Sequence, residues 1–255
     1  QTDEKIIAKQ AVVIEIEVST RYWFAKGTKL DNPQIPNVLV SPNNQFAINS
    51  TKKVEGNTWV SQIRELTLYP LEDGEVQIPP IKIFISVNTA ASGIVEGEIY
   101  TSSLHFFVEK PSELKPLDHY TASADFQLNI TNNFNPDHAY KIGDAISQTI
   151  SFSADSVPAM MLPKALKPSI EGVSIYHTPA ELQDRTSRGT LTGMRTESFT
   201  YIFEQAGEFF IPEQIFYWWN LTTQTLLTER IPKQHWVVKN AEQKNVLLSD
   251  VSDVN

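Results

Sequence analysis

Alternating apolar and polar residues flank a short glycine turn in residues 191–220, the most aromatic part of the chain. Phe199, Tyr201 and Phe203 share one face of a period-two pattern, which is typical of a half-buried β-strand. Residues 205–207 supply a turn, and the apolar run GEFFIPEQIFYWW follows. We therefore predict a β-hairpin over this segment.

A weaker copy of the segment lies upstream, between residues 65 and 87. Aligning Gly74 with Gly207 brings similar residues together at a constant shift of 133 positions, pairing Thr67 with Thr200, Leu68 with Tyr201, Ile78 with Ile211, Pro79 with Pro212 and Ile83 with Phe216. Such self-similarity indicates two related β-modules in tandem.

The composition permits two such modules. With 255 residues, 41% of them hydrophobic and 20% charged, the chain is long and apolar enough for two folded domains. The formal net charge is −9 and lysine and arginine do not cluster, which disfavours nucleic acid and anionic membranes as partners. The sequence has no cysteine, which excludes disulfides, and no run near the roughly 20 apolar residues that span a membrane.

Strand and turn signals then divide the chain. We expect an all-β protein of tandem immunoglobulin-like antiparallel β-sandwiches, because many short alternating segments occur without a long amphipathic helix. The first module covers residues 1–110, a linker covers 111–120, the second module covers 121–240, and an acidic tail covers 241–255. Within the second module, residues 179–193 are expected to form a polar loop.

Residues suited to catalysis are scattered. The five histidines lack metal-ligand spacing, and phosphate-binding, dinucleotide-binding and nucleophile-elbow motifs are absent. The acidic run at 72–75 favours a solvated turn over a cation site. We expect a protein that is not an enzyme and uses neither metal nor cofactor.

A tryptophan pair suits binding better. Trp218 and Trp219 are neighbours in an expected strand, so one ring should point outward. An exposed tryptophan can stack on a sugar or anchor a protein partner. The structural alternative is that the ring packs under an adjoining loop.

An arginine group stands out in this acidic chain. Arg185, Arg188 and Arg195 lie near Asp184, and arginine binds a partner's carboxylate through two parallel hydrogen bonds. These four residues and the two tryptophans are the candidate partner-binding residues. The alternative is that Arg195 ties the expected loop to the sheet while the other arginines are solvated.

Several short motifs along the second module resemble the BatD family, which is named for the Bacteroides aerotolerance operon and associated with oxygen tolerance. They are YKIGDAI at 140–146, MMLP at 160–163, LQDR at 182–185, LTGMRTE at 191–197, AGEFFIP at 206–212 and WWN at 218–220. The resemblance extends more loosely to the first module through TLYPLEDGEVQIPP at 67–80. The family has no established catalytic residues to carry over.

The resemblance implies an extracytoplasmic or periplasmic region of tandem immunoglobulin-like modules, anchored to the membrane beyond residue 255. It implies von Willebrand A-domain membrane proteins of the same operon as partners, a MoxR-type AAA+ ATPase as an indirect one, and a role in envelope stress. The leading hypothesis is a non-catalytic scaffold that binds the von Willebrand A partners. The alternative is a carbohydrate- or peptidoglycan-binding sandwich that uses the tryptophans.

Overall fold

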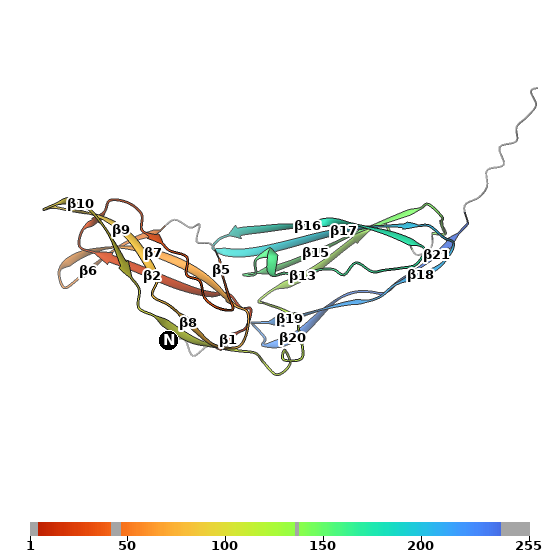
Figure 1. The fold of residues 1–255 in the computed structure, drawn as a ribbon, viewed down its shortest axis with the longest axis horizontal. Helices are drawn as coiled ribbons and strands as arrows, with labels where there is room; N and C mark the ends of the chain where they lie inside the picture. The colour runs from red at the N-terminus through yellow and green to blue at the C-terminus, as the bar shows by residue number, and fades with distance from the viewer. Residues whose placement is uncertain (1–4, 42–46, 136–137, 241–255) are drawn as a thin grey trace, which may run out of the picture. The chain divides into compact units, whose positions relative to one another are not determined.

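The computed structural model describes residues 5–41, 47–135 and 138–240 (Figure 1). Every regular element in these ranges is a β-strand, except for one turn of 3-10 helix, η1, at Ala159–Met161. No helix in these ranges is long and apolar enough to cross a membrane. The all-β class expected from the sequence is therefore confirmed, whereas the expected tail at 241–255 lies outside the described residues.

The chain divides into two compact units. Unit 1 comprises residues 1–124 and 218–226, and unit 2 comprises residues 125–217 and 227–255. The segment 111–120, which was expected to be a linker, belongs to unit 1, where Leu114 is fully buried.

Unit 1 is built on a sheet of order β2-β7-β5, in which β6 also pairs with β7, together with sheets β10-β9-β3 and β1-β11-β8. A further short strand, β4, pairs with β9. The strands are β1 (Ile6–Ile7), β2 (Val12–Thr20), β3 (Trp23–Phe24), β4 (Lys29–Leu30), β5 (Val38–Val40), β6 (Ile48–Val54), β7 (Asn57–Pro70), β8 (Gly74–Ile78), β9 (Lys82–Thr89), β10 (Gly93–Tyr100), β11 (Leu104–Glu109) and β12 (Thr121–Ser123).

Unit 2 is built on a sheet of order β13-β15-β17-β16 and a second sheet of order β14-β21-β18. A third sheet, β12-β19-β20, includes strands whose residues are shared between the units. The strands are β13 (Phe126–Asn132), β14 (Tyr140–Lys141), β15 (Ala145–Asp155), β16 (Val173–Ser187), β17 (Thr190–Phe203), β18 (Gly207–Ile211), β19 (Gln214–Asn220), β20 (Thr225–Ile231) and β21 (Gln234–Lys239).

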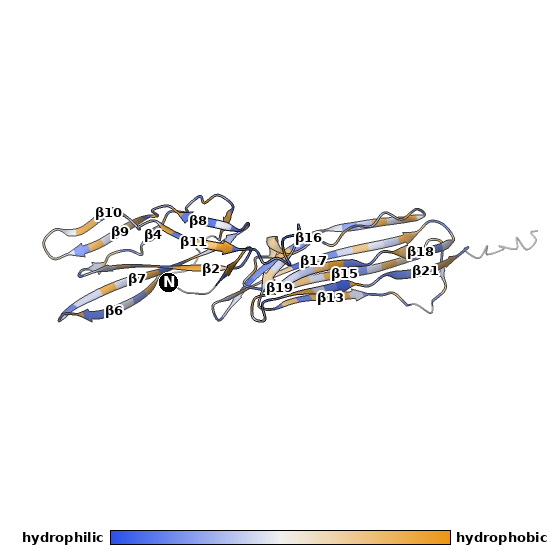
Figure 2. Cartoon of the chain, turned by 90° about the horizontal axis from the view of Figure 1, so that it is seen from below, coloured by the Kyte–Doolittle hydropathy of each residue, from blue (hydrophilic) through white to orange (hydrophobic). Residues whose placement is uncertain are grey.

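Alternating side chains along these strands form both cores, and Figure 2 shows the resulting hydrophobic and hydrophilic bands. In β17 every second residue from Gly193 to Phe203 is buried. The core of unit 1 is an aliphatic cluster that includes Ile16, Leu66 and Leu68. The core of unit 2 is aromatic, with fully buried Phe152, Phe199, Tyr201, Phe203 and Trp236.

The predicted hairpin over residues 191–220 is wrong. Its first strand, β17, pairs with β15 and β16, whereas β18 pairs with β21 in another sheet. Both edges of β17 are already occupied, so the chain crosses to the other sheet after Phe203. The upstream copy does the same, since β7 pairs with β2, β5 and β6 while β8 pairs with β11. The period-two pattern identified the strands but not their partners.

The polar loop predicted for residues 179–193 is also wrong. Strand β16 continues to Ser187 and β17 begins at Thr190, so only Arg188 and Gly189 form the turn. Both turn residues have positive φ, 51° and 85°, as a two-residue type I′ hairpin turn requires. Nearly every residue of β16 beyond Tyr176 is exposed, which removed the hydrophobic alternation that would have revealed a strand.

The internal repeat extends to the backbone. The Lys9 N–H donates to the Pro70 carbonyl at 2.6 Å, and the Gly143 N–H donates to the Phe203 carbonyl at 2.8 Å. Two matching turns are also closed by side chains: Gln10 Oε1 accepts from the Ile7 N–H at 2.9 Å, and Asp144 Oδ2 accepts from the Lys141 N–H at 2.8 Å. The turn at Glu55 and Gly56, with φ of 50° and 77°, corresponds to that at 188–189.

Candidate functional site

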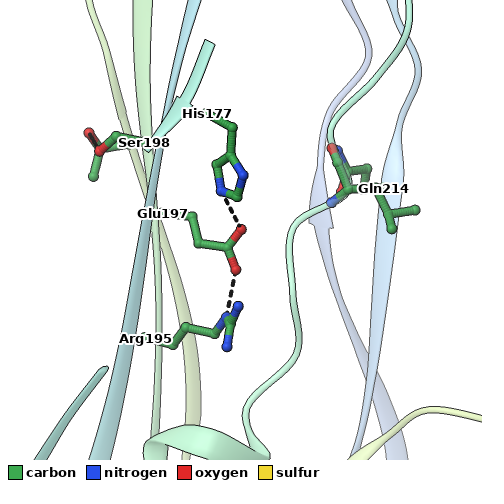
Figure 3. Close-up of polar contacts among 7 residues, drawn as sticks. His177, Arg195, Glu197, Ser198 and Gln214 are labelled. Carbon is green, nitrogen blue, oxygen red and sulfur yellow. Dashed lines mark hydrogen bonds and ion pairs between the residues drawn. The ribbon is translucent and has the colours of Figure 1, made fainter. Parts of the chain in front are cut away.

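A buried ion pair lies on the core face of β17 (Figure 3). Glu197 is 1% exposed, and its Oε1 accepts a hydrogen bond from the Arg195 Nε at 2.5 Å. Its Oε2 lies 3.1 Å from the Nε2 of His177, which projects from the neighbouring strand β16. Both oxygens of this carboxylate are therefore engaged by nitrogen atoms.

Aromatic packing holds the third member of this group in place. The His177 ring stacks on Phe199 with centroids 4.5 Å apart and planes 9° apart. Ser198 lies on the opposite face of β17, where its hydroxyl pairs with that of Thr149 at 3.0 Å (Figure 3). The group thus places a histidine and a carboxylate together, but the nearest serine along the strand faces away from them.

Strand phase is the signal that identifies these residues in the sequence. Glu197 and Arg195 continue the same period-two face as Phe199, so the alternation places them inward. The sequence made Arg195 a candidate partner-binding residue, with the alternative that it ties the expected loop to the sheet. The structure buries it to 7% exposure and pairs it, so its assignment as a partner-binding residue is corrected. A buried, paired arginine is not available to a partner's carboxylate.

The other two arginines do lie on the surface. Arg185 stands on the exposed part of β16, opposite Thr192, and Arg188 occupies the first position of the hairpin turn. Asp184 is exposed too, but its Oδ1 accepts a hydrogen bond from the backbone N–H of Ala159 at 2.7 Å. Asp184 therefore connects η1 to the hairpin.

Residues 157–168, which include η1 and connect β15 to β16, are held against the sheet at Gly193 and Gln214. A Cβ on Gly193 would lie 2.2 Å from the Val157 carbonyl oxygen and 2.5 Å from the Ala159 nitrogen, so this backbone crosses β17 without room for a side chain. Gln214 bonds both the N–H and the carbonyl of Leu166, at 2.8 and 2.9 Å. The base of the β16–β17 hairpin, which we call the arginine hairpin because Arg185 and Arg188 are exposed on it, is consequently well supported.

The structure corrects the prediction of an exposed tryptophan. Trp218 and Trp219 are 6% and 5% exposed, and their backbones pair in parallel with Thr121 and Ala122 of β12. Neighbouring strand residues do point to opposite faces, but here both faces are covered. A ring that stacks on a sugar must be exposed, so neither tryptophan supplies the carbohydrate platform that the alternative hypothesis requires.

Unit 1 has polar residues at the matching positions, of which Gln62 is buried and Arg64 is half-buried. Gln62 and Arg64 correspond to Arg195 and Glu197 at the shift of 133 residues. The Gln62 Oε1 accepts from the Thr28 N–H at 2.7 Å, and the Arg64 Nε donates to the Thr28 hydroxyl at 3.3 Å. These contacts hold the loop before β4 against the sheet.

A second exposed surface was missed by sequence reasoning. All eight residues of β10 are exposed, and the strand ends the sheet order β10-β9-β3, so in the described part of the chain one edge has no neighbouring strand. Its apolar side chains include Ile94 and Tyr100, which are 61% and 60% exposed. Edge strands of this kind are surfaces to which another chain can add.

A scan of protein-family models gave no match to this chain, and a search of curated proteins gave none either.

In the described ranges, no three histidine, aspartate or glutamate side chains are grouped so that they could hold a metal ion. The two exposed surfaces, the arginine hairpin and the β10 edge, are the features that carry a functional argument.

Proposed function

We propose that this chain is a non-catalytic interaction region of a BatD-like protein, made of two immunoglobulin-like β-sandwiches, that binds von Willebrand A-type partners outside the cytoplasm. The single observation that carries the proposal is the arginine hairpin, the tip of β16–β17 with Arg185 and Arg188 exposed. In a chain of net charge −9, an exposed arginine on β16 and another in the two-residue turn offer a docking point for carboxylates.

Rigidity supports this assignment. Binding costs less free energy when the contacting segment is already ordered. The hairpin is closed by a two-residue turn, and its base is fixed by the Asp184 contact to Ala159 and by the close backbone crossing at Gly193. The arginines are therefore presented without a large ordering cost.

The motif order supports the partner class. The LQDR and LTGMRTE motifs that resemble the family lie on the two strands of this hairpin, at 182–185 and 191–197. We further propose that the full-length protein is membrane-anchored and that a MoxR-type ATPase acts on it indirectly, through the von Willebrand A proteins.

The test is a calorimetric titration of this chain against the ectodomain of a von Willebrand A protein encoded beside its gene, with and without magnesium. We compare wild type with the double variant Arg185→Ala, Arg188→Asn. Asparagine tolerates the positive φ at position 188, so the turn is retained. Arg230→Ala is the control, because it removes an exposed arginine from β20, outside the hairpin.

Saturable binding to wild type and to the control, weakened at least about tenfold in the double variant, is the expected result, since each charge-assisted contact contributes about 1.5–3 kcal/mol. Equal binding by all three proteins would move the partner surface away from the hairpin, with the β10 edge as the next surface to vary. Absence of binding in both magnesium conditions would reject the proposed partner class.

A further inference from the structure

Unit 1 contains a small cleft of about 260 Å³ between the β7–β8 turn and the segment that follows β11. Three lysines and three carboxylates line it, with the ring of Tyr120: Lys9, Lys110, Lys115, Glu72, Asp73 and Asp118. The formal charges of these three lysines and three carboxylates cancel, whereas the whole chain has a net charge of −9.

The three lysines line the cleft without a carboxylate partner. Among the ion pairs of the described residues, none includes Lys9, Lys110 or Lys115. The Lys9 Nζ lies 4.2 Å from the centre of the Tyr120 ring and donates to the Tyr120 carbonyl at 3.4 Å. The Lys110 Nζ lies 5.6 Å from the same ring and donates to the Leu117 carbonyl at 3.3 Å. An ammonium group has three donors, so each lysine retains donors for a ligand.

The two cations also act on each other. Partial burial of Lys9, and then the nearby charge of Lys110, lower the pKa of Lys9 from its usual value of 10.5. A bound carboxylate between them would relieve this repulsion, because an opposite charge favours the protonated form of both lysines.

The internal repeat shows that a lysine is not needed here for the fold. Lys9 has a φ of 70°, a left-handed conformation that is unfavourable for a residue other than glycine. Gly143 occupies the corresponding position in unit 2, with a φ of 92° and the same backbone hydrogen bond to the end of the long central strand. Unit 1 therefore carries a lysine with a strained backbone at a position where glycine would be unstrained, and such strain is often retained at binding sites.

We propose that this cleft binds a small zwitterion of the amino-acid class. Its carboxylate lies between the Lys9 and Lys110 ammonium groups, and its ammonium group faces the carboxylates of Glu72, Asp73 and Asp118. The cleft is large enough for a free amino acid but smaller than the sites that hold drug-sized ligands. The three carboxylates disfavour phosphate, which carries more negative charge and no cation.

The experiment titrates the intact chain with glycine at constant ionic strength and follows backbone amide shifts by NMR. Acetate and methylammonium, each carrying one of the two charges, are titrated in parallel. Lys9→Gly removes the ammonium group and installs the residue that unit 2 has at this position, so folding is preserved. Lys53→Gln is the control, because Lys53 is an exposed residue of β6 and does not line the cleft.

We expect saturable shifts around Lys9 and Tyr120 with glycine, and weaker shifts with acetate or methylammonium. Lys9→Gly should lose about tenfold or more in affinity, as expected for one lost charge-assisted contact, while Lys53→Gln binds as wild type does. Glycine binding that survives unchanged in Lys9→Gly overturns the proposal, and so does a wild-type chain whose cleft residues do not shift with glycine. Equal response to acetate and glycine would overturn the zwitterion assignment.

Discussion

Unit 1 packs aliphatic side chains at positions where unit 2 packs aromatic rings. Leu66 and Leu68 on β7 correspond to Phe199 and Tyr201 on β17, and all four are buried. The strand pairing is nevertheless shared, as are the side-chain-closed turns and the backbone bonds at Lys9 and Gly143. The comparison teaches that turn geometry and strand phase specify this topology, while the identity of the core residues can vary.

The polar positions differ in a more consequential way. Arg64 of unit 1 bonds to a loop residue, Thr28, whereas Glu197 of unit 2 bonds to Arg195 and His177 on the sheet itself. Unit 2 therefore encloses two opposite charges among its aromatic rings. We therefore expect unit 2 to lose more stability when its core rings or its ion pair are changed than unit 1 loses when the matching residues are changed.

The largest effect is expected from the aromatic core. Phe203 has no exposed surface and lies 5.4–5.8 Å, centroid to centroid, from the rings of Trp236, Tyr140 and Phe209. Phe203→Ala should reduce the free energy of unfolding by about 3–5 kcal/mol because it leaves a cavity. Phe203→Leu refills most of this volume with an aliphatic side chain and should cost much less. Guanidinium unfolding followed by circular dichroism measures both, and equal costs would show that the ring itself, and not the buried volume alone, is required at this position.

Breaking the buried pair should have an effect of about 3 kcal/mol, the lower end of the range for an uncompensated buried charge. Glu197→Gln keeps the shape of the side chain but leaves the Arg195 guanidinium without its counter-charge. The double variant Arg195→Met, Glu197→Leu removes both charges and should unfold near the wild-type denaturant concentration. A single variant as stable as wild type would mean that the ion pair contributes nothing beyond its volume.

A smaller cost, about 1–3 kcal/mol, is expected from overpacking at Gly193→Ala. The new Cβ would overlap the backbone of Val157 and Ala159, whereas the matching position of unit 1 already holds a side chain, Val60. Gly97→Ala is the control, since no atom lies within 4 Å of a Cβ there. Thermal unfolding should separate the two variants, and equal melting temperatures would show that the connection moves aside freely.

The sequence predicted the all-β class and the repeat because both depend on local period-two patterns and turn residues. It failed where pairing is decided by distant strands: nothing local states that β17 is occupied on both edges, so β18 had to leave. It also failed at β16, whose exposure on both faces erased the hydrophobic alternation. Trp218 and Trp219 show the same limit, since alternation gives opposite directions but not what covers each face.

The alternation along β17 also predicts which polar residues are buried. Extending the face of Phe199 back by two and four residues predicts that Glu197 and Arg195 point inward, and two opposite charges on one buried face predict a pair. The contribution of His177 could not be predicted in this way, because it depends on the register between β16 and β17 and on the irregularity between Thr178 and Glu181.

The smallest effect concerns one tyrosine in each unit. Burial raises the pKa of Tyr201 from its usual value of 10 to about 12, and burial followed by the charge of Asp73 raises the pKa of Tyr120 to about 12. A raised tyrosine pKa favours the neutral, folded form, so its stabilising contribution is complete below pH 10 and is lost as the pH rises toward 12. Ultraviolet titration of tyrosinate, with Tyr120→Phe and Tyr201→Phe for assignment, should show both groups titrating near pH 12. Asp73→Asn should lower the pKa of Tyr120 alone, and a shift of Tyr201 in the same variant would contradict the separate origins of the two values.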